Sequence, residues 1–90
     1  MLKIILSKPS ERFLKKLGAK QFLQVDEKII SLSKNPKPND CIQLKGFKKF
    51  YRVDVGEYRI IYKITKTHLI IDLIGKRNDG EVYKKFVRLK

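Results

Sequence analysis

Cysteine, histidine and acidic side chains are scarce in this chain of 90 residues. It has one cysteine, one histidine and no tryptophan, and 9 acidic residues stand against 22 lysines and arginines. The single cysteine, Cys41, excludes an intramolecular disulfide and a zinc site made of several cysteines. Nothing in the sequence brings it to the one histidine, His68, so we interpret it as a structural or incidental thiol and not as a nucleophile. We expect no metal, no cofactor and a location in the reducing cytoplasm.

Long apolar runs are also missing. The stretch 1–6 is apolar apart from one lysine, but it has the length of a strand and is too short for a signal peptide or a membrane span. We therefore expect no association with a membrane. Ninety residues suit one small core, and we expect a single domain over residues 1–90.

What the chain has in excess is positive charge, with a formal net charge of +13 at pH 7. An imbalance of this size favours a polyanionic partner. Nucleic acid is the first candidate, because each phosphate contact releases counterions. An acidic protein partner also fits, and the two partners are compatible.

Two helices are predicted after a short, largely buried strand at Leu2–Leu6. Ser7 and the proline after it are typical of a helix start, and Gly18 is placed to end this first helix. The prolines of a basic loop over 35–46 end the second helix, which covers 20–34. Its apolar residues repeat at three- and four-residue steps and are expected to face the core: Phe22, Leu23, Val25, Ile29, Ile30 and Leu32.

A β-hairpin is predicted over 50–64. Polar and apolar residues alternate on both sides of Gly56-Glu57, which suits a two-residue type II′ turn. This turn places Asp54 opposite Arg59, and side-chain alternation then puts both on one face of the sheet. The other facing pairs are Val55 with Tyr58, Val53 with Ile60, and Arg52 with Ile61. Two arginines and a carboxylate on one face form either a surface ion-pair group or part of a phosphate site.

A third strand is predicted over His68–Gly75, with apolar residues on both faces. If the chain turns at Lys66-Thr67, Arg59 faces Ile74 and alternation directs Arg77 to the opposite face, unless Gly75 introduces a bulge. A turn at 78–80 precedes a tail for which helix and extended chain both stay open. We predict an α+β fold, in which the N-terminal strand and a three-stranded meander form a small antiparallel sheet packed against two helices.

Four short motifs follow one another along the chain: Leu44-Lys45-Gly46, Tyr58-Arg59-Ile60-Ile61-Tyr62, Ile74-Gly75-Lys76-Arg77 and Glu81-Val82-Tyr83. In this order they resemble the RelE/ParE toxin superfamily, and more narrowly its RelE-type messenger-RNA interferases. The resemblance implies a RelE-like fold and the toxin of a type II toxin–antitoxin system. It implies a ribosome-dependent endoribonuclease that cleaves messenger RNA, with a cognate antitoxin protein and the ribosome as partners.

The chemistry implied is transesterification, in which the ribose 2′-hydroxyl attacks its own phosphate. A base takes the proton, cations stabilise the charge on phosphorus, and an acid protonates the leaving oxygen. The resemblance assigns the phosphate to Arg59, the phosphate and leaving group to Arg77, and stacking or proton transfer to Tyr83. Arg52 lies where the family often has lysine, and its guanidinium suits bidentate contact with a phosphate. We expect further lysines to bind RNA, namely Lys45, Lys48, Lys49, Lys76 and Lys84.

Asp54 departs from the resemblance, because several RelE-type members carry a basic residue at this position. Its carboxylate either accepts a proton in catalysis or forms an ion pair with Arg59 that weakens the enzyme; the ion pair is favoured. Two other functions stay open. One is a ParE-like inhibitor of gyrase that cuts nothing, and the other is a non-catalytic basic module that binds RNA or the ribosome.

Overall fold

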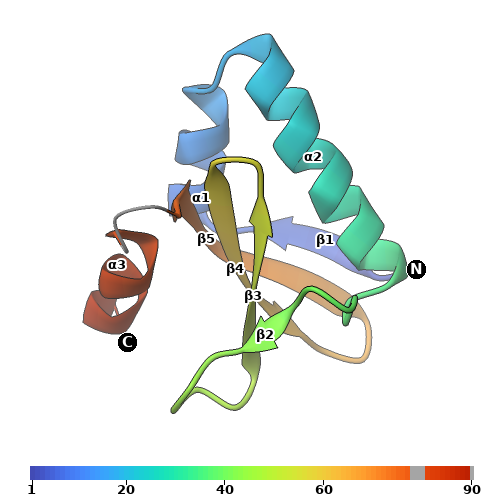
Figure 1. Cartoon of the computed structure of the whole chain (residues 1–90). Helices are drawn as coiled ribbons and strands as arrows, with labels where there is room; N and C mark the ends of the chain where they lie inside the picture. Colours follow the sequence, from blue (N-terminus) through green and yellow to red (C-terminus); the bar gives the residue numbers. More distant parts are fainter. Residues whose placement is uncertain (78–80, 90) are drawn as a thin grey trace.

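The computed structural model describes residues 1–77 and the helix 81–89, with side chains of that helix described for residues 84–88. Five strands form one sheet in the order β1-β5-β4-β3-β2, and three helices accompany it (Figure 1). The strands are β1 (Lys3–Leu6), β2 (Ile42–Gln43), β3 (Phe50–Val55), β4 (Tyr58–Ile64) and β5 (His68–Lys76). The helices are α1 (Lys8–Lys15), α2 (Ala19–Lys34) and α3 (Glu81–Leu89). The predicted α+β class is confirmed.

The sheet is mixed, and the prediction of a purely antiparallel sheet is wrong at its N-terminal edge. Strand β1 runs parallel to β5, with Ile4 opposite Leu69. Helices α1 and α2 separate β1 from the other four strands along the chain, so β1 is not tied to a neighbour by a hairpin and can lie parallel to β5. Strand β2 closes the other edge, within the stretch that we expected to be loop.

One face of the sheet packs against α1 and α2. The helices contribute Leu14, Val25, Ile29 and Leu32 to this larger core, and each is at most 5% exposed. The sheet contributes alternate residues of its three central strands: Val53, Tyr58, Ile60, Tyr62, Leu69, Ile71 and Ile74. The stripe on α2 is narrower than predicted, since Phe22, Leu23 and Ile30 are 38–57% exposed.

A smaller cluster covers the opposite face of the sheet. Phe86 of α3 is fully buried there against Leu44, Ile61 and Leu73, with Phe47 and Phe50 packed around it. Figure 1 shows α3 standing apart from α1 and α2. The tail left open by the sequence is therefore helical, and it shields part of the sheet face that carries the charged residues.

Two predictions for the N-terminal part of the chain, one on a helix end and one on burial, are wrong for reasons of local geometry. Gly18 does not end α1; it has a φ of −66° and caps the start of α2, while Lys16 caps the end of α1. Strand β1 is not buried, because it lies at the sheet edge, where Ile4 and Ile5 are 38% and 44% exposed. The predicted turn at 78–80 lies outside the described residues.

The hairpin of β3 and β4 has the predicted register in every pair, from Val55 opposite Tyr58 to Arg52 opposite Ile61. Gly56 has a φ of +57°, and Glu57 after it has a negative φ. A positive φ at the first turn position alone distinguishes type II′ from type I′. The predicted type II′ turn and the register that it sets are therefore confirmed, and Arg52, Asp54 and Arg59 lie on one face of the hairpin.

Candidate functional site

The charged side chains of the hairpin lie on the face opposite α1 and α2. Arg52, Asp54 and Arg59 alternate with Val53 and Ile60, which point into the larger core. The side chain of Arg59 is 19% exposed and that of Asp54 is 34% exposed. The predicted cluster of two arginines and one carboxylate therefore exists and is partly shielded from water.

Arg77 joins this cluster because the register between β4 and β5 shifts. Ile61 pairs with Leu73 but Tyr62 pairs with Ile71, so Asp72 is an extra residue in β5. Arg59 consequently faces Gly75, not Ile74 as predicted. Two residues beyond Gly75, Arg77 returns to the face of Arg59. A bulge does redirect Arg77, and its position is Asp72.

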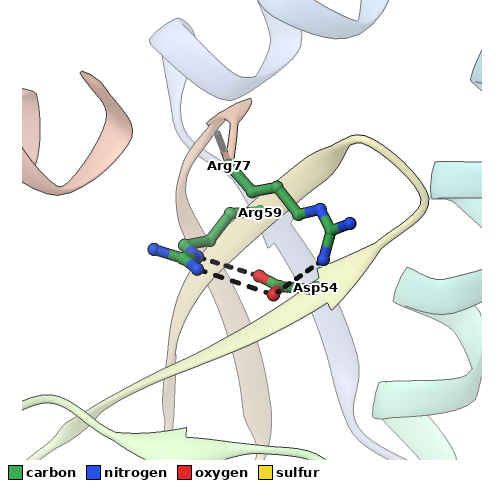
Figure 2. Close-up of polar contacts among 3 residues, drawn as sticks. All are labelled: Asp54, Arg59 and Arg77. Atoms are coloured by element: carbon green, nitrogen blue, oxygen red, sulfur yellow. Dashed lines mark hydrogen bonds and ion pairs between the residues drawn. The ribbon is translucent and has the colours of Figure 1, made fainter. Parts of the chain in front are cut away.

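Asp54 forms ion pairs with two of the three candidate catalytic arginines of the cluster, Arg59 and Arg77 (Figure 2). Arg59 Nε donates to Asp54 Oδ1 at 2.8 Å, and Arg59 Nη2 donates to Oδ2 at 3.5 Å. Arg77 Nη1 lies 3.6 Å from the same Oδ2. The carboxylate thus occupies a position between two guanidinium groups, which is also where a phosphate would gain most from them.

The hydrogen bond from Arg59 holds the pKa of Asp54 below its ordinary value of 3.8. Partial burial opposes this effect, and the positive charges of Arg59, Arg52 and Arg77 add to it. A carboxyl group with a lowered pKa is a weak base at neutral pH. Asp54 is therefore better suited to hold the arginines than to accept a proton.

The pH dependence of stability tests this ion-pair group. Because the folded-state pKa is lowered, the Asp54 carboxylate stabilises the fold above its unfolded pKa, and this contribution is lost as pH falls through the lower folded value. We expect the native chain to be more stable than Asp54→Asn at pH 7, with the difference shrinking below about pH 3.8. Urea unfolding of both proteins between pH 7 and pH 3 measures it. A difference that does not change with pH would contradict a stabilising carboxylate.

The bulge at Asp72 is held by the start of α1. The backbone N–H of Ser7 donates to Ile71 O at 3.0 Å, and Ser7 Oγ donates to Asp72 O at 2.6 Å. Ser10 is fully buried, and its Oγ donates to Ile71 O at 3.3 Å. Ser7 also caps α1, since its Oγ accepts from the N–H of Ser10. The helix cap and the strand bulge are therefore one hydrogen-bonded unit, which directs Arg77 to the charged face.

We expect Ser10→Ala to lower the free energy of unfolding by about 1 kcal/mol, the usual value of a buried hydrogen bond. Ser31→Ala is the matched control, because Ser31 lies exposed in α2 and the change has the same effect on helix propensity. Urea unfolding of the two variants measures what the Ser10 hydroxyl contributes through its bond to Ile71 O and the bond it accepts from Ser7 Oγ. Equal stabilities would show that Ser10 contributes nothing to holding the bulge.

A cleft of about 440 Å³ opens beside the cluster. Arg52 and Arg59 line it, and Lys45 and Lys84 add two ammonium groups from outside the hairpin. Among the described residues, the others that line it are Ile42, Gln43 and Leu44. Two of these belong to β2, a strand of two residues that is too short to show any alternation in the sequence, so their contribution was not predicted.

The other predicted site residues are dispersed. Lys48 and Lys49 line a different cavity, and Lys76 is exposed at the end of β5. Tyr83 belongs to α3, but its side chain lies outside the described residues. The catalytic and RNA-binding roles assigned to all these residues stay predictions.

Among the described residues, no three His, Cys, Asp or Glu side chains gather in a way that could hold a metal ion. No helix in the described part of the chain combines the length and the apolar character needed to cross a membrane.

Comparison with known proteins identifies a family. Residues 4–80 match the model of the ParE toxin of the type II toxin–antitoxin system parDE. No curated protein sequence matches the chain significantly.

Solved structures share the fold. A mutant of the Escherichia coli toxin RelE in the free state superimposes with a TM-score of 0.79 at 19% identity, covering 98% of this chain and 96% of that one. The archaeal RelE–RelB complex from Pyrococcus horikoshii gives 0.76 at 24% identity, with 87% and 97% covered. The toxin–antitoxin complex RelBE2 from Mycobacterium tuberculosis gives 0.72 at 22% identity, with 84% and 98% covered. At these identities the likeness establishes a RelE-like fold.

Proposed function

The chain belongs to the family of ParE toxins of type II toxin–antitoxin systems, and from this premise we propose that it is a ribosome-dependent endoribonuclease that cleaves messenger RNA. The observation that carries the proposal is the cleft with Arg52, Arg59, Lys45 and Lys84 in its wall. Four basic residues around one cavity suit the binding of a phosphodiester. Arg77 adds a fifth, because it pairs with the same Asp54 carboxylate as Arg59.

The proposed reaction is attack of the ribose 2′-hydroxyl on the adjacent phosphorus, with departure of the 5′-oxygen. Negative charge grows on the non-bridging oxygens, and Arg59 and Arg77 stabilise it by charge-assisted hydrogen bonds. Arg52 and the two lysines of the cleft bind the flanking strand. Tyr83, on the same helix as Lys84, stacks on a base or transfers a proton. Only RNA has the nucleophile that this reaction requires.

Asp54 opposes this reaction in the free protein. An incoming phosphate competes with its carboxylate for Arg59 and Arg77, so part of the binding energy is used to break the existing ion pairs. The aspartate therefore slows cleavage without removing any catalytic group.

We expect Asp54→Asn to raise the single-turnover cleavage rate about tenfold. A tenfold change corresponds to about 1.4 kcal/mol, close to the lower end of the range for one hydrogen bond to a charged group. The control is Asp40→Asn, which removes the same charge from an exposed carboxylate paired with Lys28. A rate that falls in Asp54→Asn, but not in the control, would mean that Asp54 is the base.

Inhibition of gyrase is the second candidate function. The description of the matched family names ParE, and an aspartate that neutralises two arginines weakens the case for a nuclease. A non-catalytic module that binds RNA or the ribosome is the third.

A purified translation system with one defined messenger RNA separates the three. Primer extension maps the breaks made by the native protein, by Arg77→Ala and by Tyr83→Phe. Breaks that require ribosomes and largely vanish in both variants support the nuclease. Intact RNA with blocked translation favours the non-catalytic binding module. Intact RNA with normal translation excludes both of these functions, and inhibition of gyrase is then assayed.

The proposal includes two partners and a location. The similar structure of RelBE2 from Mycobacterium tuberculosis is a toxin–antitoxin complex, and we propose an antitoxin for this chain as well. The second partner is the translating ribosome with its messenger RNA, which places the protein in the cytoplasm.

A further inference from the structure

A second cavity, of about 450 Å³, lies at the far end of the β3–β4 ladder from the 56–57 turn. Lys37, Lys48, Lys49 and Lys63 line it together with Tyr51, and none of the acidic residues that the structure describes does. These lysines come from three separate parts of the chain: the 35–41 loop, the approach to β3, and β4. The fold therefore gathers four lysines around one cavity, here called the lysine pocket.

The four lysines are not neutralised within the part of the chain that the structure describes. The ion pairs found there are Lys15 with Glu11, Lys28 with Asp40, and Asp54 with its two arginines. Four like charges in one cavity repel each other unless an anion binds between them. This contrasts with the arginine cluster, which contains its own carboxylate.

Aromatic rings position two of the ammonium groups. Lys37 Nζ lies 5.4 Å from the centre of the Tyr51 ring, and Lys63 Nζ lies 5.7 Å from that of Phe50, both within range of a cation–π contact. The Tyr51 ring also stacks on Tyr62, with 5.8 Å between ring centres. Because the Tyr51 ring already carries a stacked ring and a lysine, the pocket offers ammonium donors and not a platform for a base.

The stacked pair of Tyr51 and Tyr62 is held in place by its buried member, Tyr62. Tyr62 is fully buried, and its hydroxyl donates to Pro36 O at 2.7 Å. Burial raises the pKa of this hydroxyl, so it stays a neutral donor. Pro36 precedes Lys37, so this bond holds the 35–41 loop, and with it Lys37, against the end of β4.

We propose that the lysine pocket is a second phosphate-binding site, which binds the backbone of a nucleic acid strand outside the arginine cleft. The Phe50–Lys63 pair and the Asp54–Arg59 pair are four residues apart in the ladder, roughly 13 Å at the rise of a strand. The pocket thus lies several phosphates away from the cleft and binds backbone that does not react. The proposal rests on charge and cavity alone and does not require that the protein cleaves RNA.

Salt-dependent binding of uncleavable probes tests the proposal. The probes are a 2′-O-methyl RNA and a DNA of equal length and sequence, together with a polyglutamate peptide of equal charge. The pocket variant carries Lys48→Gln, Lys49→Gln and Lys63→Gln. The control variant carries Lys3→Gln, Lys8→Gln and Lys20→Gln, which removes the same charge from exposed lysines that line neither cavity.

We expect the pocket variant to bind both oligonucleotides more weakly, with the slope of log K against log salt shallower by about 2, as for three lost contacts to a single strand. The control variant should keep the native slope within about half a unit. A loss for RNA and DNA alike assigns the site to backbone phosphates, and a loss for RNA alone assigns it to RNA.

Two outcomes would overturn the proposal. Equal changes in slope for both triple variants would mean a uniform basic surface, and an equal loss for polyglutamate would mean a site for acidic peptides. Repeating the comparison in an Arg59→Ala background separates the two proposals. If Arg59→Ala abolishes cleavage, the slope difference between the two triple variants should still remain. If the slope difference is missing, the lysine-pocket proposal fails and the cleavage proposal is unaffected.

Discussion

Replacing Arg59 with alanine is expected to lower the rate of messenger RNA cleavage on the ribosome by about 100- to 1,000-fold, the usual loss when one donor to the transition-state oxyanion is removed. Arg59 is the central cation of the cluster, because it lines the cleft and also makes the shorter of the two ion pairs with Asp54. Single-turnover cleavage of a ribosome-bound messenger RNA measures the effect. Binding of the ribosome should change far less, since the charge that remains is large.

Two controls make this result specific. Arg12→Ala removes an arginine from the exposed surface of α1 and should leave the rate unchanged. Arg59→Lys keeps the charge but not the planar pair of donors, and should recover only part of the activity. If Arg59→Ala cuts as fast as the native protein, the assignment of the phosphate to this arginine is wrong.

Much of the site was predictable because the hairpin depends on local rules. A glycine at the first position of a two-residue loop determines the turn type, and the turn determines the register. The contact between Asp54 and Arg59 follows from that register and needs no information from elsewhere in the chain.

The position of Arg77 was not predictable in this way. It depends on an extra residue, Asp72, whose carbonyl and that of Ile71 bind serines more than sixty positions earlier. A bulge that is held by tertiary hydrogen bonds leaves no local signal in the sequence of the strand. Because it shifts the strand by one residue, every later side chain of that strand points to the opposite face of the sheet. The parallel pairing of β1 is hidden for the same reason, since a short apolar strand fits either direction.

The basic residues illustrate the limit of counting charges. Lys45, Lys48 and Lys49 are neighbours in the sequence and were assigned to one RNA-binding group. The fold places Lys45 in the arginine cleft and the other two in the lysine pocket, because the chain turns between them before β3. The net charge predicts a polyanionic partner. Only the fold shows that the basic residues form two separate surfaces, the arginine cleft and the lysine pocket.

Phe86→Ala is expected to detach α3 from the sheet without unfolding the rest of the protein. Truncating a buried phenylalanine costs about 3–5 kcal/mol. Phe86 is fully buried, with ring centres 4.9 Å from Phe47 and 4.8 Å from Phe50. A helix of nine residues is not stable alone in water, so α3 has to lose its structure once this contact is lost. The core between the sheet and the other two helices contains none of the α3 side chains that the structure describes, and it should persist.

Hydrogen exchange distinguishes this local event from global unfolding. Amides of α3 should lose protection in Phe86→Ala, while amides of β4 keep theirs; Val87→Ala, at a neighbouring residue that is 43% exposed, should leave both unchanged. Cleavage should fall as well, because Lys84 lines the cleft and moves with the helix. Equal loss of protection in β4 and α3 would mean that the smaller cluster supports the whole fold. In that case the cleft wall could not be removed separately from the sheet that carries the arginines.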